Sequence, residues 1–295
     1  MNVFKPSYYD EFKCIASRCK HSCCIGWEID VDDDKYEEYM KKDGEFGERL
    51  RENISEGDVP HFILKEEDRC PFLNCDNLCD IIINMGEDAL CQICRDHPRF
   101  VNCFSDRDEV GIGMCCEEAA RIILTYKDKA KITGDDCPED EETVFFNFRE
   151  QVFAVLQDRE WSAEERIENL CELYELCLTE CDWHSVYAEL ERLDPAWDEK
   201  LELLKSDEKE LANNWETEFE QILVYFVYRH LSEGFYDGRI KERLLFAILS
   251  FYVIRKIFSY GEETIDELIE ICRMYSSEIE YSEENIECLL NKLSD

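Results

Sequence analysis

The feature that most constrains this chain is the crowding of its cysteines. Twelve of the 18 cysteines fall within residues 1–116. One group, with the spacing C-x4-C-x3-C-C, occupies residues 14–24, and further groups lie in CPFLNCDNLCDI, LCQICRDHPRF and GMCCEEAAR. Soft thiolates at such spacings typically bind Zn²⁺, Cu⁺ or an iron–sulfur cluster. The pattern therefore predicts a metal or cluster site.

The sequence around these cysteines indicates a reducing compartment. The stretch MNVFKPSYYDEFKC lacks the apolar segment of a secretory signal, and the longest apolar run, LLFAILSFYVI, is too short to span a bilayer. We therefore expect a cytoplasmic protein, in which thiols stay reduced. Clustered cysteines in that setting favour metal ligation over disulfides.

The spacing favours an iron–sulfur cluster over zinc, and both remain open at this point. Structural zinc sites usually use paired C-x2-C knuckles, and only Cys91 and Cys94 have that spacing. The adjacent side chains of Cys23 and Cys24 tend to point apart, which suits a single tetrahedral ion poorly. Ligands from separate segments suit a [4Fe–4S] cluster, which takes four cysteines.

The charge of the chain limits its partners. Asp and Glu number 71 against 33 Lys and Arg, which gives a net charge of -38. This charge repels the phosphates of nucleic acids and of anionic membranes, so we expect neither as a partner. It suits a partner that presents lysines, although acidity that serves only solubility is the alternative.

From residue 144 onward, apolar residues recur at helical spacing. One helical face carries Phe145, Phe148, Val152, Val155 and Leu156. A second stripe runs from Ile167 to Cys181, where we expect Cys171 and Cys181 to pack in the core. Further helices are predicted over 214–235, 239–258, 262–276 and 282–293. No segment alternates as a convincing strand would.

The predicted fold class is mainly α. An irregular cysteine-rich N-terminal region that binds a metal or cluster packs on a C-terminal helical bundle. The predicted domains are a cysteine-cluster (iron–sulfur) domain over 1–130, an acidic linker or loop over 131–143, and an α-helical domain over 144–295.

Several stretches resemble the flagellin lysine-N-methylase family (FliB-type). They are YYDEFKCIASRCKHSCCIGWEIDVD, CPFLNCDNLCDIIINMGEDALCQICRDHPRF and CCEEAARIIL. The later stretch ILVYFVYRHLSEGFYDGRIKERLLFAILSFYVI resembles the C-terminal helices of that family. The family is in turn similar to a wider group of zinc- or iron-chelating cysteine-cluster proteins.

The resemblance implies a protein-lysine N-methyltransferase that transfers methyl groups from S-adenosylmethionine to flagellin lysines and carries a [4Fe–4S] cluster. The implied metal ligands are the cysteines at matching positions: Cys14, Cys19, Cys23, Cys24, Cys70, Cys79, Cys94 and Cys116. Eight positions exceed the four that one cluster needs, so some are structural or a second metal site exists. The remaining cysteines of the region look like local additions: Cys75, Cys91, Cys103 and Cys115. The motif CCEEAAR departs from the Ser-Cys-Pro-Glu expected of the family.

Lysine methylation requires the amine to lose its proton first. Tyr8, Tyr9 and Glu118 are candidate catalytic residues that could accept it, and surface or packing roles are the alternative. Three arginines beside cysteine motifs are candidates to bind the carboxylate of S-adenosylmethionine or to offset the negative charge of a thiolate-ligated cluster, and salt bridges to carboxylates are the alternative: Arg95, Arg99 and Arg121.

Two classes of function remain open from the sequence. The first is the S-adenosylmethionine-dependent methyltransferase. The second is a non-enzymatic zinc- or iron–sulfur-binding module that serves as scaffold, sensor or metal chaperone. The stretch EVGIGMCC lacks the third glycine and the βαβ unit of a Rossmann site. The sequence therefore predicts no Rossmann-type methyltransferase.

Overall fold

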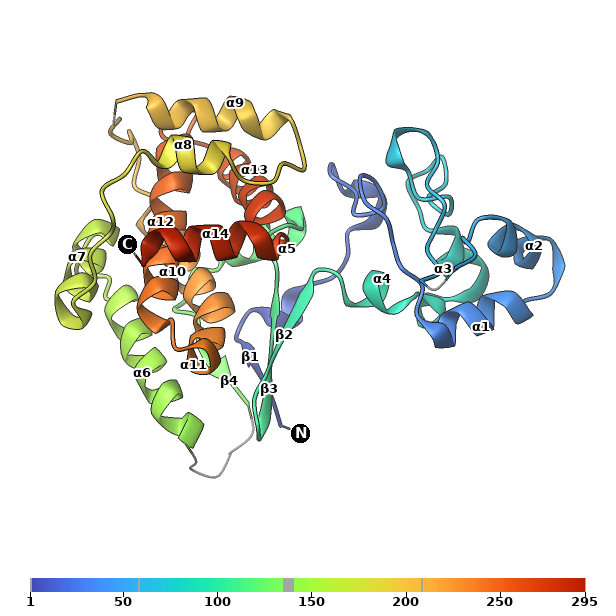
Figure 1. Cartoon of the computed structure of the whole chain (residues 1–295), viewed down its shortest axis with the longest axis horizontal. Helices are drawn as coiled ribbons and strands as arrows, with labels where there is room; N and C mark the ends of the chain where they lie inside the picture. The colour runs from blue at the N-terminus through green and yellow to red at the C-terminus, as the bar shows by residue number, and fades with distance from the viewer. Residues whose placement is uncertain (1, 58, 135–140, 208, 295) are drawn as a thin grey trace. The chain divides into compact units, whose positions relative to one another are not determined.

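The computed structural model describes residues 2–57, 59–134, 141–207 and 209–294 (Figure 1). It divides into two compact units. The helical unit comprises Met1–Phe12 and Val101–Asp295, and the cysteine unit comprises Lys13–Phe100. The division into 1–130, 131–143 and 144–295 stays a prediction. The boundaries of the two compact units fall at other residues. Residues 135–140 of the predicted linker lie outside the described residues.

The helical unit is built around two helices that are apolar on nearly every side. Helices α10 (Glu216–His230) and α12 (Ile240–Phe258) pack against each other, and α5 (Glu117–Thr125) and α13 (Ile265–Tyr275) pack beside them (Figure 1). Almost every residue from Phe219 to Tyr228 is buried. A helix that is hydrophobic all round belongs in the centre of a core, and both helices were predicted from the sequence.

The remaining helices surround this pair. They are α6 (Glu141–Leu156), α7 (Ala163–Tyr174), α8 (Trp183–Ala188), α9 (Ala196–Glu202), α11 (Gly234–Asp237) and α14 (Glu283–Leu293). Short 3-10 turns are η5 (Leu203–Lys205) and η6 (Leu231–Glu233), and η7 (Ser276–Glu280) is a π-helix.

One predicted helix is shorter than expected. Ser162 caps the start of α7 with a capping box, and Glu175 ends the helix in the left-handed conformation with φ 53. Cys181 lies beyond this end and Cys171 is half-buried. The prediction of one helical stripe from Ile167 to Cys181 is therefore wrong in its second half. No sequence expectation covered α8 or α9.

A small sheet completes the helical unit, although the sequence suggested no strand. The strands are β1 (Asn2–Pro6), β2 (Arg99–Cys103), β3 (Arg107–Ile112) and β4 (Ile132–Thr133), in the order β2-β3-β1-β4. β1 runs parallel to β3, with Asn2 opposite Arg107, and antiparallel to β4. The division between the two units falls within β2.

The cysteine unit is irregular, as predicted. Its helices are short: α1 (Asp33–Lys41), α2 (Gly44–Glu52), α3 (Asp80–Met85) and α4 (Gln92–Asp96). The 3-10 turns of this unit are η2 (Ala16–Arg18), η3 (Glu66–Asp68) and η4 (Glu87–Ala89), and the turn η1 (Tyr9–Glu11) belongs to the helical unit. The core of the unit contains Tyr39, Phe62 and Phe72 together with the thiols of Cys70 and Cys91.

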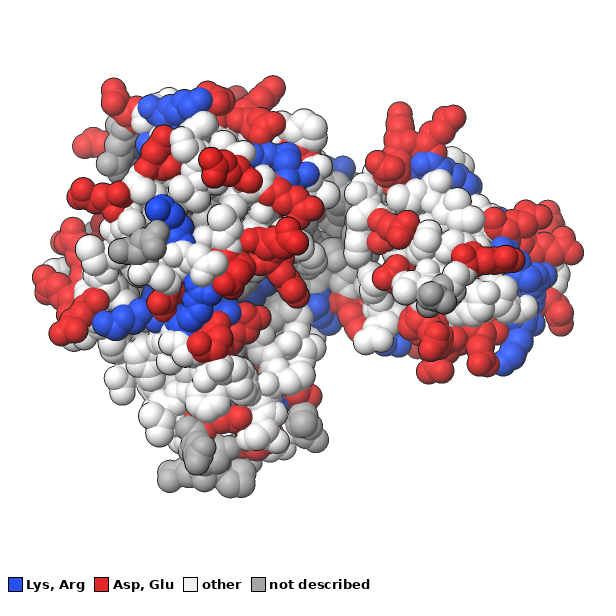
Figure 2. Space-filling view, in the orientation of Figure 1, with Lys and Arg blue, Asp and Glu red and all other residues white. Residues whose placement is uncertain are grey.

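The architecture as a whole confirms a mainly α fold. Among the residues described, no helix combines the length and apolarity needed to cross a bilayer. On the faces visible in Figure 2, Asp and Glu gather on both units.

Candidate functional site

The candidate metal centre of the cysteine unit is a group of thiols brought together from three segments. Cys24 and Cys70 are joined by their backbones, because the Cys70 amide donates to the Cys24 carbonyl at 2.8 Å. Cys79 immediately precedes α3 and forms an antiparallel bridge with Leu73. Cys94 lies within α4.

These four thiols influence one another electrostatically. Burial raises the pKa of the Cys70 thiol to about 12, and negative charge on Cys24 and Cys79 adds to the effect. Burial likewise raises the pKa of Cys79, again with a contribution from Cys24. The pKa of Cys94 is raised by its hydrogen bond with Cys91, by burial, and by the charges of Cys24 and Cys70. The four predicted ligands therefore form one electrostatically coupled group.

Cys24 differs from its neighbours because hydrogen bonds stabilise its thiolate. Its pKa is lowered to about 7, chiefly by a hydrogen bond from Cys23, against the opposing effect of burial. Ser22 and the positive charge of Arg69 lower it further. Cys24 is thus the thiol of this group that ionises most readily, as a ligand must.

A cation suits this group chemically. Half-buried and buried thiols that raise one another's pKa lose their protons only when a positive charge compensates, and metal ligation supplies that charge. A single tetrahedral Zn²⁺ with Zn–S bonds of about 2.3 Å holds sulfurs about 3.8 Å apart. In the described part of the chain, no three of these thiols lie within 4.8 Å of one another. As placed in this structure, the four thiols do not surround a single tetrahedral ion.

The other four predicted ligands are Cys14, Cys19 and Cys23 of the cysteine unit and Cys116 of the helical unit, and Cys23 contacts the group through its hydrogen bond to Cys24. Cys14 accepts the Ala16 amide at 3.4 Å, and Cys19 donates to the His21 carbonyl at 3.2 Å. Cys23 is exposed beside Cys24. Cys116 belongs to the helical unit, where it precedes the first residue of α5.

Cys91, interpreted from the sequence as a local addition, is a member of the thiol group. It is fully buried and shares a hydrogen bond with Cys94, which lowers the pKa of Cys91. Its C-x2-C spacing with Cys94 was the available signal. Nearby, the indole of Trp27 donates to the Cys23 carbonyl at 2.6 Å. Burial lowers the pKa of His97 to about 4, so this imidazole is neutral near pH 7.

The predicted catalytic residues lie in the helical unit. Tyr8 is buried and packs edge-on against Tyr126, with the ring centroids 5.5 Å apart. Burial raises the pKa of Tyr8, so its phenol stays protonated and is a poor proton acceptor. Tyr9 begins η1 and is partly exposed, with the Lys5 ammonium 5.8 Å from its ring.

The third predicted catalytic residue, Glu118, forms an ion pair with Arg121, one of the predicted cofactor-binding arginines. Arg121 donates to both Glu118 oxygens at 2.7 Å, which is a bidentate pair within α5. In the cysteine unit, Arg95 pairs with Asp96 at 3.2 Å, and Arg99 donates to the Arg95 carbonyl at 3.4 Å. Arg95 and Arg121 thus have the carboxylate partners that the salt-bridge alternative requires.

Sequence reasoning missed a buried ionic network in the helical unit. Glu280 of η7 is paired with His230 at 2.5 Å and with Arg229 at 3.2 Å, and it accepts the Tyr225 hydroxyl at 2.9 Å. The Tyr225 hydroxyl in turn accepts the Met114 amide at 3.1 Å. Apolar runs flank these residues, so nothing in the sequence showed that the charges meet.

Comparisons with known proteins relate the chain to one family. Residues 182–295 match the family model described as the FliB lysine N-methylase C-terminal domain. Over 142 residues the chain is 25% identical to the flagellar biosynthetic protein FliU of Salmonella muenchen, covering 43% of this chain and 80% of that protein. Over 142 residues it is also 25% identical to the lysine-N-methylases of Salmonella typhimurium and Salmonella choleraesuis, covering 43% of this chain and 34% of each.

The FliB-type resemblance recognised from the sequence is confirmed by these matches, and residues 182–295 are similar to that family's C-terminal domain. The match spans about a third of the length of the two lysine-N-methylases. No solved structure matches the chain.

Proposed function

We propose that this chain is an S-adenosylmethionine-dependent protein-lysine N-methyltransferase that acts on flagellin and holds a [4Fe–4S] cluster. The match of residues 182–295 to a lysine N-methylase domain carries the proposal. The names of the relatives, lysine-N-methylase and flagellar biosynthetic protein, support the reaction and the substrate. Acidic side chains on both units suit a partner that presents lysines.

The cluster is held by Cys24, Cys70, Cys79 and Cys94 in this proposal. At three of these family-type positions, Cys70, Cys79 and Cys94, the thiol pKa is raised in part by negative charge on the fourth, Cys24. Cys91 lies beside Cys94 as a hydrogen-bond partner. When bound, such a cluster supplies electron-transfer or Lewis-acid chemistry.

The reaction requires a neutral amine. S-adenosylmethionine, when bound, would supply the methyl group, and residues of this chain would have to take the proton from the lysine ammonium so that the nitrogen lone pair is free. Because burial keeps the Tyr8 phenol protonated, it suits hydrogen bonding to the substrate better than proton removal. Among the three catalytic candidates, Glu118 and Tyr9 remain proposed acceptors of the amine proton.

The cofactor carboxylate would be bound by Arg95, Arg99 or Arg121. Arg121 already holds Glu118 through two bonds of 2.7 Å, so recruiting it would release the Glu118 carboxylate. That exchange would couple cofactor binding to the exposure of a proton acceptor in α5. Arg95, whose contact with Asp96 is a single bond at 3.2 Å, is the less committed arginine.

The test uses the full chain purified without oxygen. Iron and sulfide are measured first, and transfer of a labelled methyl group to flagellin of the same cell is measured second. We expect Cys79→Ser to lose iron and sulfide, and Cys75→Ser to keep both, because Cys75 is exposed. Bound zinc without sulfide would contradict the proposed [4Fe–4S] cluster. A protein that holds its cluster but transfers no methyl group to flagellin would contradict the proposed methyltransferase activity.

A second function is supported by one observation. The thiol group lies wholly within the cysteine unit, outside the residues 182–295 that match the lysine N-methylase domain. A non-enzymatic metal-binding module could therefore be carried by Lys13–Phe100. Metal binding with no methyl transfer to flagellin would favour this alternative.

A further inference from the structure

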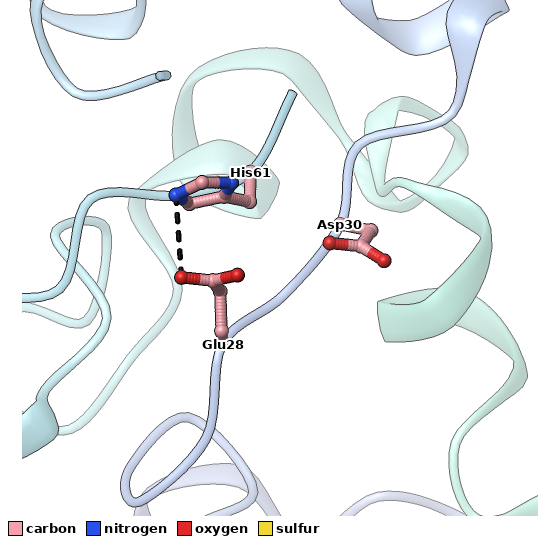
Figure 3. A group of neighbouring side chains, drawn as sticks. All are labelled: Glu28, Asp30 and His61. Atoms are coloured by element: carbon pink, nitrogen blue, oxygen red, sulfur yellow. Dashed lines mark ion pairs between the residues drawn. The ribbon is translucent and has the colours of Figure 1, made fainter. Parts of the chain in front are cut away.

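The cysteine unit contains a second group of potential metal ligands, and none of them is a thiol. Glu28, Asp30 and His61 offer ligand atoms that all lie within 4.8 Å of one another (Figure 3). The His61 Nε2 is 3.2 Å from a Glu28 oxygen. Among the residues described, no other set of three or more His, Cys, Asp or Glu meets this spacing.

Local pairing of two extended segments produces this arrangement. Ile29 and Val31 are buried, so the side chains of Glu28 and Asp30 point to the opposite, outer side. Asp30 lies directly opposite His61 in an antiparallel bridge. The bridge is fixed by hydrogen bonds on both sides, from the Phe62 amide to the Ile29 carbonyl at 2.9 Å and from the Val31 amide to the Pro60 carbonyl at 2.7 Å.

The second ring nitrogen of His61, Nδ1, contacts two further groups that orient the imidazole. Nδ1 lies 3.2 Å from the Val59 carbonyl and 2.9 Å from the Ser55 hydroxyl. Because a carbonyl only accepts, a proton on Nδ1 makes the contact with Val59 a hydrogen bond and leaves Nε2 free to bind a metal. The other ring nitrogen, Nε2, faces the Glu28 carboxylate. Nε2 and a Glu28 oxygen are 3.2 Å apart, close enough for one bound cation to contact both atoms.

We propose that Glu28, Asp30 and His61 bind a divalent first-row transition metal. Two carboxylates and one imidazole suit Mn²⁺, Fe²⁺ or Zn²⁺, whereas soft Cu⁺ prefers thiols. The hydrogen bond from His61 to a backbone carbonyl is the arrangement that usually orients a metal-binding histidine. Glu28 and Asp30 are exposed, so water completes the coordination. The ion joins the strand that follows Cys23 and Cys24 to the segment 54–62.

The probe is Mn²⁺, because carboxylate and imidazole ligands bind it and thiols compete poorly. The full chain, with its thiols kept reduced, is titrated with Mn²⁺. The electron paramagnetic resonance signal of free Mn²⁺ reports the concentration of the unbound ion. We expect one tight site per chain. Glu28→Gln and Asp30→Asn should each weaken that site by about tenfold or more, since even loss of an outer partner costs about 10–100-fold.

The matched control removes the same charge elsewhere in the unit. Glu66 is exposed and lies outside the group, so Glu66→Gln should leave Mn²⁺ affinity unchanged. Cys24→Ser should also leave it unchanged, which separates this site from the proposed cluster. Equal losses in Glu66→Gln and Glu28→Gln would overturn the proposal, because diffuse acidity would then explain the binding. Full binding in both Glu28→Gln and Asp30→Asn would overturn it as well.

Discussion

Neutralising Glu109 should destabilise the helical unit strongly. Arg149 of α6 donates to both Glu109 oxygens, at 2.6 and 2.7 Å, and both side chains are almost completely buried. Burial opposes the charge on Arg149, but Glu109 outweighs it and raises the pKa of the guanidinium. Glu109→Gln therefore leaves a charged arginine in the core between β3 and α6.

The magnitude follows from the burial of the pair. Removing one partner of a buried ion pair costs about 3–5 kcal/mol, because the other charge remains uncompensated. For a unit of this size each kcal/mol lowers Tm by about 2–4 °C, so the expected decrease is about 6–20 °C. Replacing both partners, as Glu109→Leu with Arg149→Met, should recover most of the loss, since neither charge of this pair stays buried and Arg107, 4.0 Å from Glu109, keeps its contact with Asp106.

Scanning calorimetry of the full chain measures this effect. The control is Glu287→Gln, which breaks the bond to Arg239 at 2.9 Å, where the Glu287 side chain is 58% exposed. That change should cost less than about 1 kcal/mol. The reasoning is refuted if Glu109→Gln melts within a degree or two of the parent chain, or if the double variant melts far below the single one.

Three further changes test other parts of the structure. Burial lowers the pKa of His230 despite its bond to Glu280, so the unfolded state binds more protons and stability falls as pH drops below about 6.5. Urea titrations should show a smaller fall in the free energy of unfolding for His230→Gln. An equal fall in the variant would show that His230 is not the group responsible. Ser162→Ala removes the cap of α7 and should cost about 0.5–2 kcal/mol in unfolding free energy, with Ser162→Thr near neutral as the comparison. Tyr39→Phe leaves the buried Ala89 carbonyl without its donor and should cost about 1–3 kcal/mol by chemical denaturation, so a stable variant would show that the bond contributes little.

The helices of the core could be predicted because their signal is local. The segments that became α10 and α12 carry long apolar runs bounded by charges, and the predicted ranges 214–235 and 239–258 contain them. The end of α7 could not be predicted, because Glu175 adopts the left-handed conformation without the glycine that usually marks it. The strands were missed for another reason: Asn2 pairs with Arg107, and no local pattern encodes so distant a register.

The candidate site shows the same division between local and distant information. Cysteine spacing and resemblance named Cys24, Cys70, Cys79 and Cys94, and the structure places these thiols within electrostatic reach of one another. Which of the eight matched cysteines group together depends on chain folding, not on spacing. The set of Glu28, Asp30 and His61 was invisible for this reason, since it arises from a single bridge between distant segments.

The position of β1 in the sheet has a consequence for biosynthesis. β1 lies between β3 and β4, so its partners are made about a hundred residues after it. Topologically, the cysteine unit is an insertion between the first strand and the rest of the helical unit. On the ribosome, Lys13–Phe100 emerges and begins to fold while β1 still lacks partners, since domains fold as they are synthesised. The proposed ligands of the cysteine unit are therefore available to metal ions before the helical unit has closed its sheet.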